Sequence, residues 1–197
     1  WPTDEVHDIL PFELLENRVL ASSLVFRAGA IRFDGSLRYS GDWVAMLELS
    51  RRGLAGFVGE PSTFWRLHAG QAHRVSPGVV AEEIRIRRAI LGDPNLWNAP
   101  HSDPRKIELG LARCALALNA VCHLAGDRRG ASEALRLARR YDPSNPTLRK
   151  RRLAPFLPWS FVARRLWPNV PDPEVIRGQL NAEKLRPFRF RDGGSQT

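Results

Sequence analysis

At four of the places in this 197-residue chain where a short polar side chain stands directly before a proline, the pair coincides with an expected helix start. The four pairs are Ser76-Pro77, Asp103-Pro104, Asn145-Pro146 and Asp172-Pro173. A Ser, Asp or Asn side chain accepts a hydrogen bond from the first turn of a helix, and proline suits the first helical position because its missing N–H has no partner there. The pairs therefore predict four helix starts, and the chain from residue 76 onward should be helical.

The turn residues between these pairs predict where the helices end. We expect helices over roughly 77–91, 104–125, 146–153 and 173–185, and one more at about 129–141 between Gly126 and Asp142. Residues 106–146 resemble one tetratricopeptide-type helical hairpin. In that resemblance Gly126 lies at the turn, and Ala131, Ala134, Leu135 and Ala138 line the second helix. An array of this kind needs at least three repeats, so the hairpin is either a packing appendage or a site that recruits a protein partner.

Residues 1–76 show a mixed pattern of short strands and short helices. The expected strands are Leu20–Phe26, Leu54–Val58 and Ser62–Leu67. Asp34-Gly35 predicts a turn, and Ser40 predicts the cap of a helix that runs from about Gly41 to Arg52.

Charge is unevenly distributed along the chain. The net charge is +9, but residues 1–104 hold 11 Lys and Arg against 13 Asp and Glu, whereas residues 105–197 hold 19 against 8. A basic half attracts anionic partners such as lipid headgroups, although an Arg-rich surface that is simply solvated has the same composition. A nucleic-acid partner is not expected, because the sequence has no recognisable helix-turn-helix, zinc or aromatic-strand motif.

The two cysteines indicate a reducing compartment. Cys114 and Cys122 fall in one predicted helix, about 12 Å of rise apart, which is too far for a disulfide. We expect both to be reduced and buried in a cytoplasmic protein. The apolar stretch Cys114–Ala125 is shorter than the roughly 20 residues of a membrane span. No secretory signal is visible, and a chain that opens at Trp1 is expected to be an excerpt or a processed product.

Two blocks of the first 76 residues resemble the C-terminal part of bacterial family 2 glycosyltransferases of the GT-A type. The first runs from Asn17 to Trp43 and contains Phe33-Asp-Gly-Ser-Leu, followed by Gly41-Asp-Trp43, similar to the family's "Phe-Asp-x-x-Leu … Glu/Asp-Asp-Trp" loop. The second, Glu60-Pro-Ser-Thr-Phe-Trp-Arg-Leu-His68, is similar to "Glu-Pro-Leu-x-x-Tyr-Arg-x-His". The resemblance implies an α/β (α+β) fold, an incomplete GT-A-like catalytic half followed by an all-α C-terminal extension.

The resemblance implies that Asp42 is the catalytic base. Inverting sugar transfer needs a carboxylate that takes the proton of the acceptor hydroxyl as the donor sugar is attacked. The alternative for Asp42 is a first-turn aspartate favoured by the helix dipole. Gly41 stands where the family commonly has a second acidic residue.

By the same resemblance, Arg66 and His68 lie beside the donor diphosphate, and His68 is a candidate contact of its divalent metal, Mg or Mn. Trp43 and Trp65 either contact the acceptor or sugar or fill the core. Residues 1–197 contain no Asp-x-Asp motif and no glycine-rich phosphate loop. The chain alone is therefore expected to be inactive, because the nucleotide-binding half of the complete enzyme would precede it.

These patterns divide the chain into three expected parts. Residues 1–76 form the acceptor-side half of the glycosyltransferase domain, 77–153 a helical extension with the hairpin 106–146, and 154–197 a basic aromatic tail. The implied partners are a nucleotide-sugar donor and a saccharide or lipid-linked acceptor of cell-envelope synthesis. Aromatic and Arg residues in 155–168 suit either the inner face of the cytoplasmic membrane or packing on the catalytic domain. The competing interpretation is a helical interaction module without catalysis.

Overall fold

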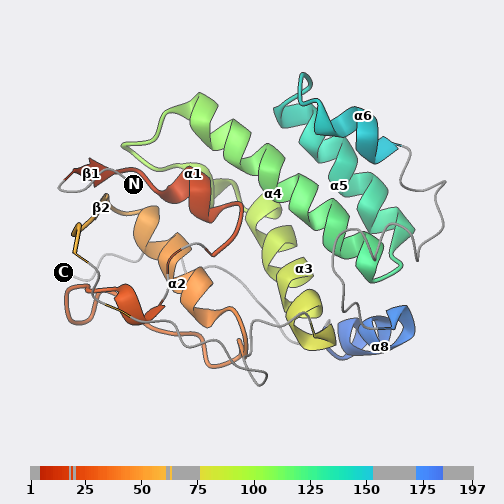
Figure 1. Ribbon diagram of the computed structural model, residues 1–197, viewed down its shortest axis with the longest axis horizontal. Helices are drawn as coiled ribbons and strands as arrows, with labels where there is room; N and C mark the ends of the chain where they lie inside the picture. Colours follow the sequence, from red (N-terminus) through yellow and green to blue (C-terminus); the bar gives the residue numbers. More distant parts are fainter. Residues whose placement is uncertain are drawn as a thin grey trace.

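The computed structural model describes residues 5–17, 19, 21–60, 63, 76–152 and 172–183 (Figure 1). Helices dominate this part of the chain, and the strands pair in one small antiparallel sheet. The elements are β1 (Val6–His7), α1 (Leu10–Glu13), a 3₁₀ turn (Ala21–Ser23), α2 (Gly41–Ser50), β2 (Ala55–Gly56), α3 (Pro77–Gly92), a second 3₁₀ turn (Pro94–Trp97), α4 (Pro104–Leu124), α5 (Arg128–Tyr141), α6 (Thr147–Arg152) and α8 (Pro173–Glu183). For the described residues from 76 onward, the prediction of a largely helical chain is confirmed.

All four predicted helix starts are capped as the sequence indicates. Each capping side chain accepts a hydrogen bond from a backbone N–H of the first turn, which would otherwise have no partner. The donor–acceptor distances are 3.3 Å from Val79 N to Ser76 Oγ, 2.8 Å from Arg105 N to Asp103 Oδ1, 3.0 Å from Thr147 N to Asn145 Oδ1, and 2.8 Å from Glu174 N to Asp172 Oδ1. Local side-chain chemistry therefore accounts for where α3, α4, α6 and α8 begin.

The expected helical hairpin is formed by α4 and α5. Gly126 makes the turn between them with a φ of +65°, a conformation that glycine adopts without steric cost. The inner side of α5 is lined by small buried residues, which let the two helices approach closely: Gly130, Ala131, Ala134 and Ala138. The Asn119 side-chain amide, buried on α4, donates a hydrogen bond of 2.8 Å to the Ala131 carbonyl. The hairpin is thus joined by packing and by one buried polar contact.

Of the three strands predicted for the first 76 residues, the first is wrong, the second forms only in part and the third is not tested. Residues 21–23 form a 3₁₀ turn, residues 24–27 have no regular structure, and Val25 is fully exposed. A strand requires a hydrogen-bonded neighbour, and no described segment pairs with these residues. Of the predicted strand 54–58, only the two residues of β2 form a strand. They pair with β1 in the register Val6 to Gly56 and His7 to Ala55. Residues 62–67, apart from Thr63, lie outside the described residues.

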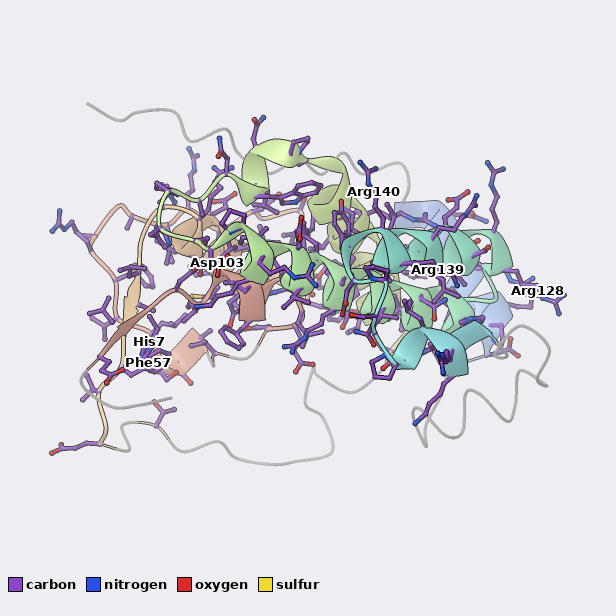
Figure 2. The ribbon with its side chains drawn as sticks, turned by 90° about the horizontal axis from the view of Figure 1, so that it is seen from above. His7, Phe57, Asp103, Arg128, Arg139 and Arg140 are labelled. Carbon is purple, nitrogen blue, oxygen red and sulfur yellow. The ribbon has the colours of Figure 1, made fainter. Side chains whose placement is uncertain are left out.

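The small sheet closes one end of the molecule. The rings of His7, on β1, and Phe57, directly after β2, meet edge to face with centroids 5.8 Å apart (Figure 2). Because this sheet has two strands of two residues each, it cannot supply a layer on which helices pack. The described residues therefore hold a helical assembly, and the α/β half implied by the family resemblance is not seen among them.

Helix α4 lies at the centre of the molecule (Figure 1). A first core cluster joins α1, α2, α3 and α4 through residues such as Leu10, Leu47, Ile90 and Leu111. A second cluster joins α3, α4, α5 and α8, with Ile84, Leu118, Ala134 and Ile176 among its members. The first cluster draws residues from both sides of position 76, where the sequence pattern changes. Packing is therefore continuous across the boundary expected between the first two parts.

The whole of α4 is long and apolar enough to span a membrane, whereas the stretch Cys114–Ala125 alone is too short. However, 72% of its most apolar window is buried inside the protein, and core helices of soluble proteins pass the same test. Both cysteines on this helix are free and buried, as predicted. The apolar character of α4 is explained by its contacts with α1, α3 and α5.

Candidate active site at the start of helix α2

Asp42 lies in the first turn of α2, as the sequence predicted, and its side chain is partly exposed. Its Oδ1 accepts a hydrogen bond of 2.8 Å from the backbone N–H of Trp43. Ser40, the residue before the helix, makes no side-chain capping bond. Asp42 thus satisfies one of the free N–H groups at this helix end, where the helix dipole favours a negative charge.

A buried carboxylate on α3 holds the segment that leads into α2. Glu82 is 2% exposed and accepts hydrogen bonds from three consecutive backbone N–H groups. Oε1 accepts from Arg38 at 2.8 Å, and Oε2 accepts from Tyr39 at 2.8 Å and from Ser40 at 2.7 Å. Hydrogen bonds to an ionised acceptor are stronger than neutral ones. Glu82 therefore fixes the backbone up to two residues before Asp42, and we call this arrangement the Glu82 clamp.

The loop before the clamp is also shaped by local contacts. Asp34 makes the predicted turn, in which Ser36 N donates to Asp34 Oδ1 at 2.8 Å and Leu37 N donates to Asp34 O at 3.1 Å. The Tyr39 ring then rests on the first turn of α3 at Gly78, where an added Cβ would lie 2.6 Å from Tyr39 Cε2. The loop is thus held against α3 by a backbone clamp and by a ring that lies close to the Gly78 backbone.

Trp43 follows Asp42 but points into the core. It is 2% exposed, and its indole N–H donates a hydrogen bond of 2.6 Å to the Glu13 carbonyl. The Arg87 guanidinium lies 4.8 Å from the centre of its ring, a cation–π contact. A side chain covered in this way has no face left for a sugar. The structure therefore assigns Trp43 the packing role and not acceptor contact.

Arg87 is a buried cation at the point where four helices meet. It is 4% exposed, and its Nε and Nη2 lie 3.3 and 3.2 Å from Glu83 Oε2. Its Nη1 donates to the Leu15 carbonyl, after α1, and lies 3.9 Å from Cys114 Sγ on α4. Because an unpaired charge at this depth would be costly, these partners make Arg87 a structural joint beneath α2.

Sequence patterns did not reveal the roles of Glu82 and Arg87. Both lie on α3, where alternating charges are typical of an exposed helix face. Their partners are distant in sequence: 42 to 44 residues separate Glu82 from the clamped N–H groups. No local spacing rule can detect such a pairing. One sequence feature could have indicated these buried roles. Two charged residues stand among the apolar positions of a helix that must be buried.

The remaining predicted site residues cannot be placed. Arg66, His68 and Trp65 lie outside the described residues, so their roles stay predictions. Within the described ranges, no three His, Cys, Asp or Glu side chains come together in a group that could hold a metal ion. The Mg or Mn expected in the complete enzyme stays a prediction, and we derive no step through that ion.

Neither cysteine is suited to nucleophilic chemistry. Burial raises the pKa of the Cys114 thiol, against the opposing influence of Arg87. Burial likewise raises the pKa of Cys122 to about 12, with Arg88 opposing. Since the thiolate is the reactive form, both thiols are inert at neutral pH.

A hollow of about 230 Å³ lies beside α3 and α8. It is lined by Arg88, Ala125, Asp127, Arg177, Leu180 and Asn181. Its cations are already engaged: Arg88 pairs with Asp127 at 2.7 Å, and Arg177 donates to the Ala125 carbonyl at 3.3 Å. Asp127 also caps α5 by accepting from Gly130 N. These contacts explain the charges of the hollow as structural, and none of its lining residues belongs to the Asp42 region.

No family model, curated protein or solved structure matches this chain. The candidate site therefore rests on its residues and their geometry: a partly exposed carboxylate at the start of a helix whose approach loop is anchored by a buried acid.

Proposed function

We propose that this chain is the acceptor-side half of an inverting, family 2-like glycosyltransferase, in which Asp42 is the general base. The reaction transfers a sugar from a nucleotide-sugar donor to a hydroxyl group of a saccharide or lipid-linked acceptor, in polysaccharide or glycolipid synthesis. The observation that supports this most is the Glu82 clamp, which orders the loop directly before Asp42.

In the proposed reaction, the Asp42 carboxylate removes the proton of the acceptor hydroxyl as its oxygen attacks C1 of the donor sugar. The new bond joins C1 to the acceptor oxygen, and the bond from C1 to the phosphate oxygen breaks, so that the nucleoside diphosphate leaves with the bonding electrons. The proton remains on Asp42. A base of this kind must lie within hydrogen-bond reach of the hydroxyl, about 2.6–3.2 Å.

Rigid support is what such a base requires. Positioning groups act only when they are held near the productive geometry by packing and by hydrogen bonds behind them. Asp42 has both kinds of support: Trp43 and Leu47 bury the inner side of α2, and Glu82 holds the backbone at Ser40. A first-turn aspartate with only a capping role would not need an anchored approach loop. The support behind Asp42 therefore favours the base over the alternative of a simple helix residue.

The competing proposal, a tetratricopeptide-like module that binds a protein through residues 106–146, has less support. Such modules use the exposed inner face of stacked hairpins. Here α4 of the hairpin packs on α1 and α3, and its residues Leu111 and Leu118 are buried in the two core clusters. The hairpin's own neighbours in the chain thus occupy the face that a partner would need.

The test uses the full-length encoded protein and measures sugar transfer and hydrolysis of nucleotide sugars. Asp42→Asn keeps the size of the side chain and removes its basicity, so it should lower the transfer rate by about 100-fold or more. Asp103→Asn is the matched control. Asp103 is also an aspartate at a helix start, and asparagine caps helices equally well, so this variant should keep full activity.

The outcomes separate the two proposals. Near-normal transfer by Asp42→Asn, with an unchanged circular dichroism spectrum, would remove Asp42 as the base. Absence of transfer and hydrolysis in the unaltered full-length protein, across common nucleotide sugars with Mg or Mn, would reject the enzyme. The interaction module would then be the remaining proposal, and capture of a partner lost on deletion of residues 104–197 would establish it.

A further inference from the structure

Most of the chain's excess positive charge lies in α5, α6 and the link between them. Residues 128–152 contain nine Lys and Arg against two Asp and Glu, a net charge of +7, compared with +9 for all 197 residues. The buried residues of α5 are glycine and alanine, so its arginines lie outside the contact with α4, whereas Arg151 on α6 donates a hydrogen bond of 3.3 Å to Asn119 Oδ1. The arginines of α5 are therefore a property of the outer surface.

The cations of α5 gather on its outer side. Arg128, Arg136, Arg139 and Arg140 are exposed and follow one another at spacings of eight, three and one residues, which places them along one side of a helix. Figure 2 shows Arg128 at one end of α5 and Arg139 and Arg140 toward the other. Arg149 and Lys150, both exposed, continue the charge onto α6, which packs beside α5 (Figure 1). We call these six residues the basic face.

The two acids in this segment do not neutralise the basic face. Glu133 forms an ion pair with Arg129, which is not part of the basic face, and the distance from Arg129 Nε to Glu133 Oε1 is 3.0 Å. Asp142 is 7% exposed and accepts hydrogen bonds from Ser144 and Asn145. Within the described part of the chain, the side chains of the six residues of the basic face make no hydrogen bond or ion pair. Unpaired like charges held side by side raise the local potential and attract an anionic surface.

We propose that the basic face binds the surface of an anionic phospholipid membrane. The inference stands independently of the sugar chemistry proposed above. A row of cations on adjacent helices matches a two-dimensional array of phosphates, and each Lys or Arg near such a surface strengthens binding about fivefold.

The sequence that follows α6 favours a membrane over a nucleic acid. Three residues after Arg152 begins the segment 155–168, in which two arginines, Arg164 and Arg165, accompany seven large apolar side chains. These are Phe156, Leu157, Trp159, Phe161, Val162, Leu166 and Trp167. Aromatic and aliphatic residues next to arginines are typical of segments at a lipid interface, where the apolar groups enter the headgroup region. The phosphate backbone of a nucleic acid offers no comparable apolar layer.

The experiment measures co-sedimentation of the whole chain with vesicles of phosphatidylcholine, either pure or containing about 30 mol% phosphatidylglycerol. The protein should bind the anionic vesicles, bind the neutral ones at least about tenfold more weakly, and lose binding as salt is raised from about 0.1 to 0.5 M. Arg139→Gln/Arg140→Gln removes two cations of the basic face and should weaken binding to anionic vesicles about 20- to 30-fold.

Arg27→Gln/Arg38→Gln is the matched control. It removes the same charge from two exposed residues of the loop region between α1 and α2, away from α5 and α6. This variant should change vesicle binding less than about threefold. An equal loss in both double variants would overturn the proposal, because net charge alone would then explain binding. Equal binding to neutral vesicles, or preferential binding to an added DNA duplex over anionic vesicles, would overturn it as well.

Discussion

The α4–α5 hairpin and the loop that leads into α2 are stabilised over very different distances along the chain. In the hairpin, the Asn119 amide reaches the Ala131 carbonyl 12 residues away, and Gly126 makes the turn. In the loop region, Glu82 lies 42 residues from Ser40, and the Trp43 indole reaches Glu13 across 30 residues. One region is organised by local contacts, and the other by contacts with distant parts of the chain.

The difference explains why the candidate site belongs to the second region. Closing a long loop costs conformational entropy that only tertiary contacts can offset. A segment without regular structure of its own can present a side chain in a geometry that helices do not offer, provided that a rigid scaffold holds it. Here α3 is that scaffold. The comparison predicts that the loop region can be disturbed separately, whereas changes at α4 should affect the whole molecule.

The largest effect is expected from Glu82→Ala. The variant leaves the N–H groups of Arg38, Tyr39 and Ser40 without their acceptor and should lower the free energy of unfolding by about 3 kcal/mol. Urea unfolding measures this loss. Hydrogen exchange should show that these three amides lose protection first, while the amides of α4 and α5 keep theirs.

Glu133→Ala is the control for Glu82→Ala, because it removes an exposed glutamate whose ion pair is with the exposed Arg129. It should change stability by less than about 0.5 kcal/mol. If the two variants were equally stable, or if exchange rose evenly over the whole chain, the Glu82 clamp would not be the anchor of a separate region.

Gly→Ala changes on α4 and α8 should have smaller effects on the free energy of unfolding, and the two effects should have opposite signs. At Gly110, where α4 crosses α1, a Cβ would lie 2.8 Å from the Pro11 carbonyl oxygen. Gly110→Ala should therefore destabilise the protein by about 1–2 kcal/mol, despite the better helix propensity of alanine. At Gly178, in α8, a Cβ meets nothing within 4 Å, so Gly178→Ala should stabilise by about 0.5–1 kcal/mol.

Thermal unfolding of the two glycine variants measures both shifts. A gain in stability at Gly110 would mean that α1 does not pack on α4 as closely as described. The packing between the loop region and the hairpin would then be less tight than the first core cluster indicates.

The smallest effect concerns pH and involves the hairpin region alone. Burial and the nearby Arg151 lower the pKa of His123 below 6.5, its usual value. As pH falls through 6.5, the unfolded chain takes up a proton before the folded chain does, so stability should decrease between pH 6.5 and the lowered pKa. His123→Gln should flatten this part of the stability profile measured by urea unfolding at pH 7 and pH 5. An identical slope in the variant would assign the dependence to another group.

The sequence by itself determined the helical part of this protein. Capping side chains, prolines and the glycine at 126 act within one helical turn, so their effects can be predicted from residues that are adjacent in the sequence. Ser76, Asp103, Asn145 and Asp172 accordingly cap helices where expected. The position of Asp42 at the start of α2 was also predicted, although Ser40, the expected cap, makes no side-chain capping bond.

Only the tertiary structure decided how the first part of the chain is held. Apolar residues such as Val25 and Phe26 suggested a strand, but a strand forms only where a partner strand is available, and none is present among the described segments. The buried roles of Glu82 and Arg87 likewise depend on groups tens of residues away. Local patterns encode local hydrogen bonds, whereas the burial of a charge is determined by which distant segments pack around it.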